Sequence, residues 1–118
     1  MSRDNLAIQR RQYQQRLADT LRQIVATLSE NPDVEQAILF GSYAQGRRDL
    51  FTDLDILIVM HSPLDFVTRT AEMYRTLSSS VDLDLFVYTP EELDRNRHRS
   101  LVRQALEKGV LLYEKRAA

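Results

Sequence analysis

The chain has 118 residues, enough for one domain and too few for two, so residues 1–118 are expected to form a single unit. The absence of cysteine excludes disulfides, thiolate zinc sites and a cysteine nucleophile. A formal net charge of −1 argues against a dedicated nucleic-acid binder, although it does not exclude a local basic patch. The polar N-terminus shows no signal peptide and the longest apolar run is residues 56–60, so we expect a cytoplasmic protein without a membrane span.

The first predicted element is one long helix over about residues 4–29, a segment that contains neither glycine nor proline. Only its second half carries apolar residues at helical spacing, and that half is expected to pack on the core. These residues are Leu17, Leu21, Ile24, Val25 and Leu28. The first half is nearly all polar, so we expect it to project into solvent or to meet a partner, which leaves homo-oligomerisation open.

Three apolar segments predict strands, at Val34–Phe40, Asp53–Met60 and Val81–Tyr88, and residues 110–113 predict a short edge strand. In the second strand, Ile56 and Ile58 should lie on one face, and Asp55, Leu57 and Val59 on the other. Residues 41–52 are expected to form a loop. The catalytic core should therefore span about residues 34–115.

Two helix starts are marked by capping signals. Ser62 followed by Pro63 predicts a helix that runs to about residue 77. Thr89-Pro90-Glu91-Glu92 comes close to a capping box and predicts a helix to Lys108, with an interruption near residues 97–100 and a C-cap at Gly109. Together the elements predict an α/β (α+β) fold, a small mixed sheet covered by helices.

Two of the three glycines lie in one turn, Gly41-Ser42-Tyr43-Ala44-Gln45-Gly46, directly after an apolar strand. Glycine allows a positive φ and lets a large anion approach the backbone N–H groups, while Ser42 adds a hydroxyl donor. The turn is therefore a candidate phosphate cradle. Taken alone, however, the pattern favours an ordinary strand-to-loop turn.

Acidic residues interrupt two of the apolar strands. Asp53 and Asp55 are two apart at the start of one strand, so their side chains share a face, and Asp82 and Asp84 repeat this pattern in the next. Such acids are costly beside a buried strand unless something neutralises them, and magnesium ions would do so. The competing interpretation of the first pair is that Asp53 only caps the loop and Asp55 faces water. For the second pair it is a solvent-facing edge acid, and this holds for at least one of Asp82 and Asp84.

The order and spacing of these motifs resemble the nucleotidyltransferase superfamily that includes DNA polymerase β, and within it the minimal nucleotidyltransferases. The family motif is a Gly-Ser turn, a second Gly, a short variable loop, and Ser-Asp-x-Asp leading into a hydrophobic strand. This sequence reads GSYAQG-RRDLF-TDLDILIV and departs only at Thr52, which keeps the hydroxyl of the usual serine. The resemblance covers roughly residues 20–115.

The resemblance implies that Asp53 and Asp55 bind two Mg²⁺ ions, and that Asp84 is the third carboxylate, which helps to deprotonate an attacking hydroxyl. Asp84 is preferred to Asp82 because the acid of similar sequences lies five residues before the threonine of the next helix start, here Thr89. Asp82 remains the alternative.

The resemblance further implies that Gly41 and Ser42 hold the β- and γ-phosphates of ATP or another NTP, and that Gly46 allows the turn. An acceptor hydroxyl would attack the α-phosphorus, and pyrophosphate would leave. Arg47 and Arg48, in the variable loop, are candidates to contact the triphosphate or the acceptor.

Minimal domains of this family often act as antitoxins that modify a helical HEPN-type toxin, so the resemblance implies a macromolecular acceptor and a HEPN-type partner. The alternative is a non-catalytic nucleotide-binding or protein-interaction module of the same fold. The two hypotheses differ in whether the aspartates are required for activity.

Overall fold

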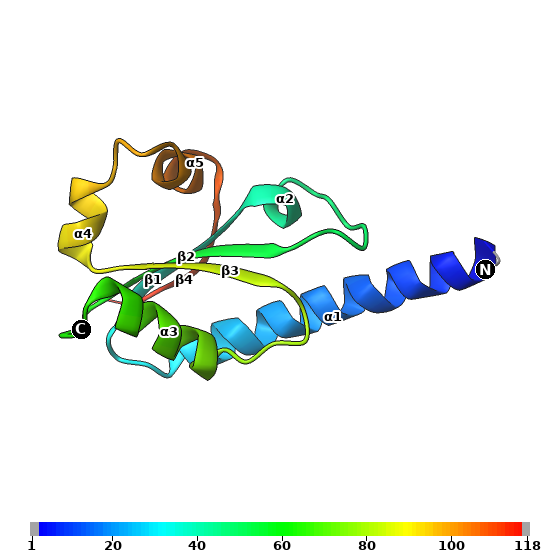
Figure 1. Ribbon diagram of the computed structural model, residues 1–118, viewed down its shortest axis with the longest axis horizontal. Helices are drawn as coiled ribbons and strands as arrows, with labels where there is room; N and C mark the ends of the chain where they lie inside the picture. The colour runs from blue at the N-terminus through cyan, green and yellow to red at the C-terminus, as the bar shows by residue number, and fades with distance from the viewer. Residues whose placement is uncertain (1–2, 117–118) are drawn as a thin grey trace.

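The computed structural model describes residues 3–116 and shows a four-stranded mixed sheet with helices on both faces (Figure 1). The strands lie in the order β3-β2-β1-β4, with β2 and β3 parallel and the other neighbours antiparallel. The strands are β1 (Val34–Phe40), β2 (Leu54–Met60), β3 (Leu83–Tyr88) and β4 (Val110–Glu114). The helices are α1 (Arg3–Ser29), α2 (Gly41–Ala44), α3 (Phe66–Thr76), α4 (Pro90–Arg95) and α5 (Ser100–Lys108). The predicted fold class and the edge strand near residues 110–113 are confirmed.

The long helix α1 packs on the sheet through its second half only. Its buried residues recur every three or four positions, as an amphipathic helix requires, and they are Tyr13, Leu17, Thr20, Ile24 and Leu28. Residues 3–12 are exposed, and this half extends beyond the sheet (Figure 1), which gives the molecule its elongated dimensions of 51 × 28 × 28 Å. The prediction of a projecting polar half is confirmed. No helix within residues 3–116 has the length and apolar character needed to cross a membrane.

Alternation along β2 divides the apolar side chains between two cores. Ile56 and Ile58 are fully buried with α1 and α3, whereas Leu57 and Val59 pack beneath α4 and α5. This is the predicted distribution of faces. Asp55 has the same parity as Leu57, so it points toward the α4–α5 side of the sheet.

The helix after β2 begins one turn later than its sequence signal predicted. Asp65 is the N-cap of α3, because its carboxylate accepts a hydrogen bond from the Thr68 N–H at 2.8 Å. The Ser62 hydroxyl instead accepts from the Leu64 N–H at 3.1 Å and closes a turn that precedes the helix. The predicted cap at Ser62 is therefore wrong.

The second capping signal is confirmed in full. Thr89 and Glu92 form a reciprocal capping box at the start of α4, and a break at residues 96–99 separates α4 from α5. Glu92 also pairs with Arg69, a side chain only 3% exposed, at 2.6 Å. Arg69 donates further hydrogen bonds to the Val87 and Leu64 carbonyls, so it ties α3 to the end of β3 and to α4.

The second strand begins at Leu54 rather than at the predicted Asp53, and two further predicted boundaries move. The segment expected as a loop, residues 41–52, opens with the single turn of α2, which is closed by the Gln45 N–H donating to the Gly41 carbonyl at 3.1 Å. The third strand begins at Leu83 rather than Val81, because the Ser79 hydroxyl bonds both the N–H and the carbonyl of Val81 and holds it in a turn. Gly109 caps α5 as predicted, at a negative φ of −75°.

Candidate active site

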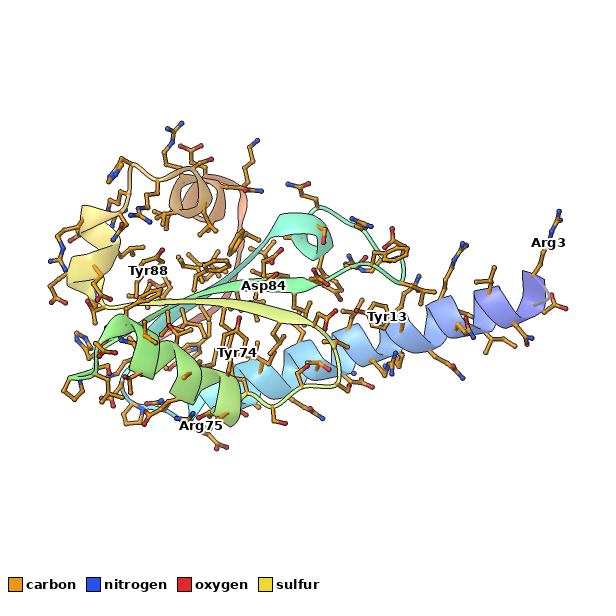
Figure 2. All side chains as sticks on the ribbon, viewed as in Figure 1. Arg3, Tyr13, Tyr74, Arg75, Asp84 and Tyr88 are labelled. Carbon is orange, nitrogen blue, oxygen red and sulfur yellow. The ribbon has the colours of Figure 1, made fainter. Side chains whose placement is uncertain are left out.

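The predicted acidic residues meet where β2 and β3 begin. Asp55 of β2 stands opposite Asp84 of β3 in the parallel register, and on its other side it stands opposite Phe40 of β1. All three have the parity of the α4–α5 face. Figure 2 labels Asp84 on the strands, below α2 in this view. The row Phe40–Asp55–Asp84 is therefore an acidic pair beside an aromatic ring.

Burial and crowding of like charges make Asp55 a poor place for a negative charge. Burial first, then a side-chain hydrogen bond with Asp84, and then repulsion from Asp84 and Asp53, raise the pKa of Asp55 from 3.8 to about 6. A hydrogen bond between two carboxyl groups requires a proton on one of them. Without a cation, the pair therefore retains a proton more readily than two separate aspartates would.

Asp53 lies just before β2 and interacts with its acidic neighbours through charge. Its pKa is raised by burial first, and then by repulsion from Asp82 and Asp84. Among the described residues, no three His, Cys, Asp or Glu side chains form a ready metal-binding cluster. The structure thus brings Asp55 and Asp84 together as a pair and leaves Asp53 and Asp82 at its edge.

The glycine turn lies directly against the carboxylate of Asp55. Gly41 has a φ of +76°, and a Cβ built on it would stand 2.0 Å from Asp55 Oδ2 and 2.9 Å from Asp55 Cγ. Only glycine allows this approach. Gly46 also has a positive φ, +99°, but a Cβ there would meet nothing within 4 Å. Gly41 and Asp55, fourteen residues apart in sequence, are therefore packed directly against one another.

The loop between α2 and β2 is ordered by a residue that the sequence interpretation did not select, Asp49. Its carboxylate accepts hydrogen bonds from Arg47 Nε at 2.7 Å, the Phe51 N–H at 2.9 Å and the Thr52 hydroxyl at 3.3 Å. These bonds, that from Arg47 first, lower the pKa of Asp49, although burial opposes them. Asp49 lies two residues before Phe51 and three before Thr52, a local Asx pattern that could have identified it.

The two loop arginines differ in their surroundings. Arg47 is half-exposed in its ion pair with Asp49. The Arg48 guanidinium lies 3.5 Å from the centroid of the Tyr43 ring and donates to the Tyr43 carbonyl at 2.8 Å, so it braces the turn after Ser42. The pKa of Arg47 is raised by its hydrogen bond with Asp49 first and then by the charge of Asp49, with a smaller contribution from the charge of Asp53.

Helix α1 anchors the same loop just before Asp53. The buried Tyr13 hydroxyl donates to the Thr52 carbonyl at 2.7 Å, and Gln14 Nε2 donates to the Arg48 carbonyl at 3.1 Å. Thr52 is fully buried, so its methyl group packs in the core while its hydroxyl bonds Asp49. Sequence periodicity indicated that α1 packs on the core but not that it holds this loop.

Replacing Tyr13 by phenylalanine should lower the free energy of unfolding by about 1–2 kcal/mol, because the buried Thr52 carbonyl loses its hydroxyl donor. Urea denaturation followed by circular dichroism measures this loss. Tyr113→Phe is the matched control, since it removes a hydroxyl from a half-buried ring of β4 and should change the stability by less than about 0.5 kcal/mol. Equal losses in the two variants would refute the anchoring role of Tyr13.

Known proteins resemble both the sequence and the fold. The family model "Polymerase beta, Nucleotidyltransferase" matches residues 22–118. A candidate protein adenylyltransferase from Methanocaldococcus jannaschii is 34% identical over 80 residues, which is 68% of this chain and 79% of that protein. A candidate nucleotidyltransferase from Sulfolobus solfataricus has the same fold, with a TM-score of 0.62 at 24% identity over 90% of this chain and 87% of that one.

Two further structures are toxin–antitoxin complexes. A MntA–HepT mutant with two Asp-to-Glu substitutions gives a TM-score of 0.55 at 28% identity, covering 81% of this chain and 74% of that one. A toxin–antitoxin complex with AMP-PNP gives 0.51 at 27% identity, covering 87% and 74%. Because the family model spans most of the sequence and the archaeal relative agrees with it, this chain is a nucleotidyltransferase and belongs to the polymerase beta nucleotidyltransferase family.

Proposed function

We propose that the chain acts as a single-domain, Mg²⁺-dependent adenylyltransferase of the cytoplasm, which transfers AMP from ATP to a hydroxyl of a protein. The observation that carries this proposal is the Asp55–Asp84 pair on adjacent strands, with Gly41 against the Asp55 carboxylate. Three related proteins support the nucleotide and the acceptor. The archaeal relative is named for protein adenylyl transfer, one related complex contains AMP-PNP, and another pairs MntA with a toxin.

The residues present fit divalent cations. Carboxylate oxygens are the ligands that Mg²⁺ prefers, and the ion is usually held by one or two carboxylates together with substrate phosphates rather than by a closed protein cage. Asp55 and Asp84 offer such a pair of carboxylates on adjacent strands, and a cation between them would relieve the repulsion that raises the pKa of Asp55 after burial and their hydrogen bond. Asp53, Asp55 and Asp84 would hold two Mg²⁺ ions, which when bound lower the pKa of the attacking hydroxyl and offset charge on the transferring phosphoryl group.

The other site residues position the triphosphate. The chain at Gly41 lies close enough to Asp55 that a β- or γ-phosphate on the turn would be beside the acids. Ser42 is partly exposed next to Gly41, and its carbonyl accepts the Arg47 N–H at 3.0 Å, which closes the turn around it. Gly41 and Ser42 thus bind the leaving pyrophosphate, and Gly46 supplies the second positive φ that returns the chain toward β2.

Asp84 is the residue that we assign to proton removal. The acceptor oxygen forms a bond to the α-phosphorus, the bond from that phosphorus to the bridging oxygen breaks, and pyrophosphate leaves with the bonding electrons. The hydroxyl proton passes to the Asp84 carboxylate. Most of the rate enhancement then comes from positioning and electrostatic stabilisation, as in other phosphoryl transfers.

The acceptor is a partner protein of the HEPN type, as the family resemblance implies. The site lies on the α4–α5 face at the start of β2 and β3, and none of the described elements forms a separate substrate-binding domain around it. A macromolecule that presents a hydroxyl side chain can bind over such an open site and enclose it. The related MntA–HepT complex supports this assignment of partner.

ATP should raise the melting temperature of the purified protein when Mg²⁺ is present and should have little effect in EDTA. Binding at about 100 times the Kd stabilises the native state by about 2.7 kcal/mol. Differential scanning fluorimetry with each NTP, with and without Mg²⁺, measures the shift and identifies the preferred base. Transfer itself is then measured with α-labelled ATP and the HEPN-type partner.

The matched control is Asp94→Asn. It removes an exposed carboxylate of α4 that pairs with Arg97, and it should leave the Mg²⁺-dependent shift in melting temperature unchanged. An identical shift with and without Mg²⁺, or none with any NTP, would refute the proposed function. A Mg²⁺-dependent shift without transfer to any partner would instead favour the non-catalytic alternative.

A further inference from the structure

The edge strand β3 carries Asp84 on the α4–α5 face of the sheet, and a side chain from α3, on the other face, supports the backbone of this strand. β3 ends the sheet and has β2 as its one neighbouring strand, so the outward backbone groups of β3 have no strand to pair with. Tyr74, in the last turn of α3, supplies the missing partner. Its hydroxyl donates to the Leu83 carbonyl at 3.3 Å and accepts from the Leu85 N–H at 2.9 Å.

These two backbone groups belong to the residues on either side of Asp84. The inward groups of the same segment pair with β2, where Asp84 stands opposite Asp55. The backbone around Asp84 is therefore held from both sides, by β2 and by one phenolic oxygen. A carboxylate two bonds from its Cα can move far if an edge strand frays, so its position depends on this support.

Tyr74 lies on the other side of the sheet from Asp55 and Asp84, although it lines a surface pocket together with Asp82. Its side chain is 40% exposed and belongs to α3, which covers the face opposite to that of Asp84. Figure 2 shows Tyr74 between the sheet and the helices below it, and Asp84 above. Tyr74 therefore reaches Asp84 through the backbone of β3, at the Leu83 carbonyl and the Leu85 N–H.

We propose that Tyr74 is a positioning residue of the active site, which fixes the Asp84 carboxylate opposite Asp55 by bridging Leu83 and Leu85. The proposal rests on the proposed function, because it takes Asp84 to be a metal-binding carboxylate. Loss of the bridge loosens the approach of Asp84 to Asp55. Residues that orient metal ligands typically change metal affinity by about 10–100-fold when they are lost.

The test is a Mg²⁺ titration of nucleotide binding to Tyr74→Phe. The probe is α,β-methylene-ATP, which cannot be cleaved at the bond broken in transfer, and binding is followed by calorimetry at fixed nucleotide and increasing Mg²⁺. The Mg²⁺ concentration for half-maximal binding should rise by about tenfold. Tyr88→Phe is the matched control, because it changes the same residue type on β3 itself, where the ring packs against Phe66, and it should shift the midpoint less than twofold.

A double-mutant cycle separates positioning from a general loss of stability. If Tyr74 acts through Asp84, then Tyr74→Phe should cause no further shift of the Mg²⁺ midpoint in an Asp84→Asn background. A full tenfold shift in that background would overturn the proposal, as would an unmoved midpoint in Tyr74→Phe alone. Both of these results would be compatible with the proposed function. That function would instead be refuted if the wild-type protein bound the analogue without any need for Mg²⁺.

A measurement on the unaltered protein keeps the proposal testable if Tyr74→Phe folds poorly. The amide of Leu85 faces outward from an edge strand and would exchange rapidly with solvent unless the Tyr74 hydroxyl holds it. Hydrogen exchange followed by NMR should show that amide slowed by at least about 100-fold relative to an unstructured chain. Rapid exchange of Leu85 in the folded protein would overturn the bridge directly.

Discussion

Replacing Asp55 by asparagine should lower the rate of AMP transfer by about a thousandfold or more, and it should stabilise the metal-free protein. The rate falls because the amide cannot serve as an anionic ligand beside Asp84, and the electrostatic support of the transition state is lost. Removal of one group that stabilises the transition state electrostatically costs about 3–4 kcal/mol of activation free energy, or roughly two to three powers of ten in rate, and Asp55 would in addition be a metal ligand.

The stability change has the opposite sign, because the folded protein raises the pKa of Asp55 from 3.8 to about 6. Between these values the folded state binds more protons than the unfolded state, so stability falls as the pH rises through this window, and the penalty is complete above about pH 6. Asparagine carries no charge and avoids it. Because Asp55 is partly exposed and solvent screens part of the effect, we expect a gain of about 1 kcal/mol at pH 7.

Urea denaturation in EDTA at pH 7 and pH 4 measures the change in stability. A transfer assay with labelled ATP on the same preparations measures the change in rate. The gain in stability should be present at pH 7 and absent near pH 4, where aspartate in the wild type is already protonated. Asp94→Asn, an exposed acid on α4, should match the wild type in both assays. A variant that is less stable and equally active would contradict both the burial argument and the assignment of Asp55.

The strands and their faces could be predicted because they depend on local alternation. In β2, apolar residues on both faces predict a strand buried from two sides, and Ile56 and Leu57 do lie in different cores. The capping box of Thr89 and Glu92 could also be predicted from the sequence, because its two residues are only three positions apart. The start of α3 was misassigned because Ser62 and Asp65 both offer a capping oxygen, and only the packing of the helix decides between them.

The pairing of Asp55 with Asp84 could not be predicted from local sequence patterns. Alternation placed Asp82 and Asp84 on one face without choosing between them, and the family resemblance favoured Asp84. The structure places Asp84 opposite Asp55 through the register of two strands separated by α3, and that register follows from tertiary packing. The assigned roles of these aspartates and of the glycine turn stay predictions until the variants are measured.

The supporting side chains were the least predictable part. Tyr13 and Tyr74 look like ordinary amphipathic residues in sequence, because a helical period reports which face packs and not which backbone group a hydroxyl will reach. Each donates to a carbonyl beside an aspartate of the site, at Thr52 and at Leu83. These contacts join residues that are far apart in sequence: Tyr13 lies 39 residues before Thr52, and Tyr74 lies 9 residues before Leu83.

Replacing Gly41 by alanine should both destabilise the fold and abolish Mg²⁺-dependent ATP binding. Two costs add at this position. The φ of +76° is strained for any residue with a Cβ, by about 1–2 kcal/mol, and the new methyl would stand 2.0 Å from Asp55 Oδ2, so the carboxylate must move. Overpacking of this kind costs about 1–3 kcal/mol more. We therefore expect a total loss of about 2–5 kcal/mol.

Gly46→Ala separates the two costs, because Gly46 has a φ of +99° but open space around a new Cβ, so only the backbone strain of about 1–2 kcal/mol should appear. A second separation comes from Asp55→Ala, which removes the Oδ2 and Cγ atoms that the methyl of Gly41→Ala would meet and leaves the Asp55 Cβ at 3.3 Å. In urea denaturation without metal, Gly41→Ala should therefore cost less in the Asp55→Ala background than in the wild type. Equal costs in the two backgrounds would mean that Gly41 is needed for its backbone conformation alone, and that the turn and the acidic strand are not one site.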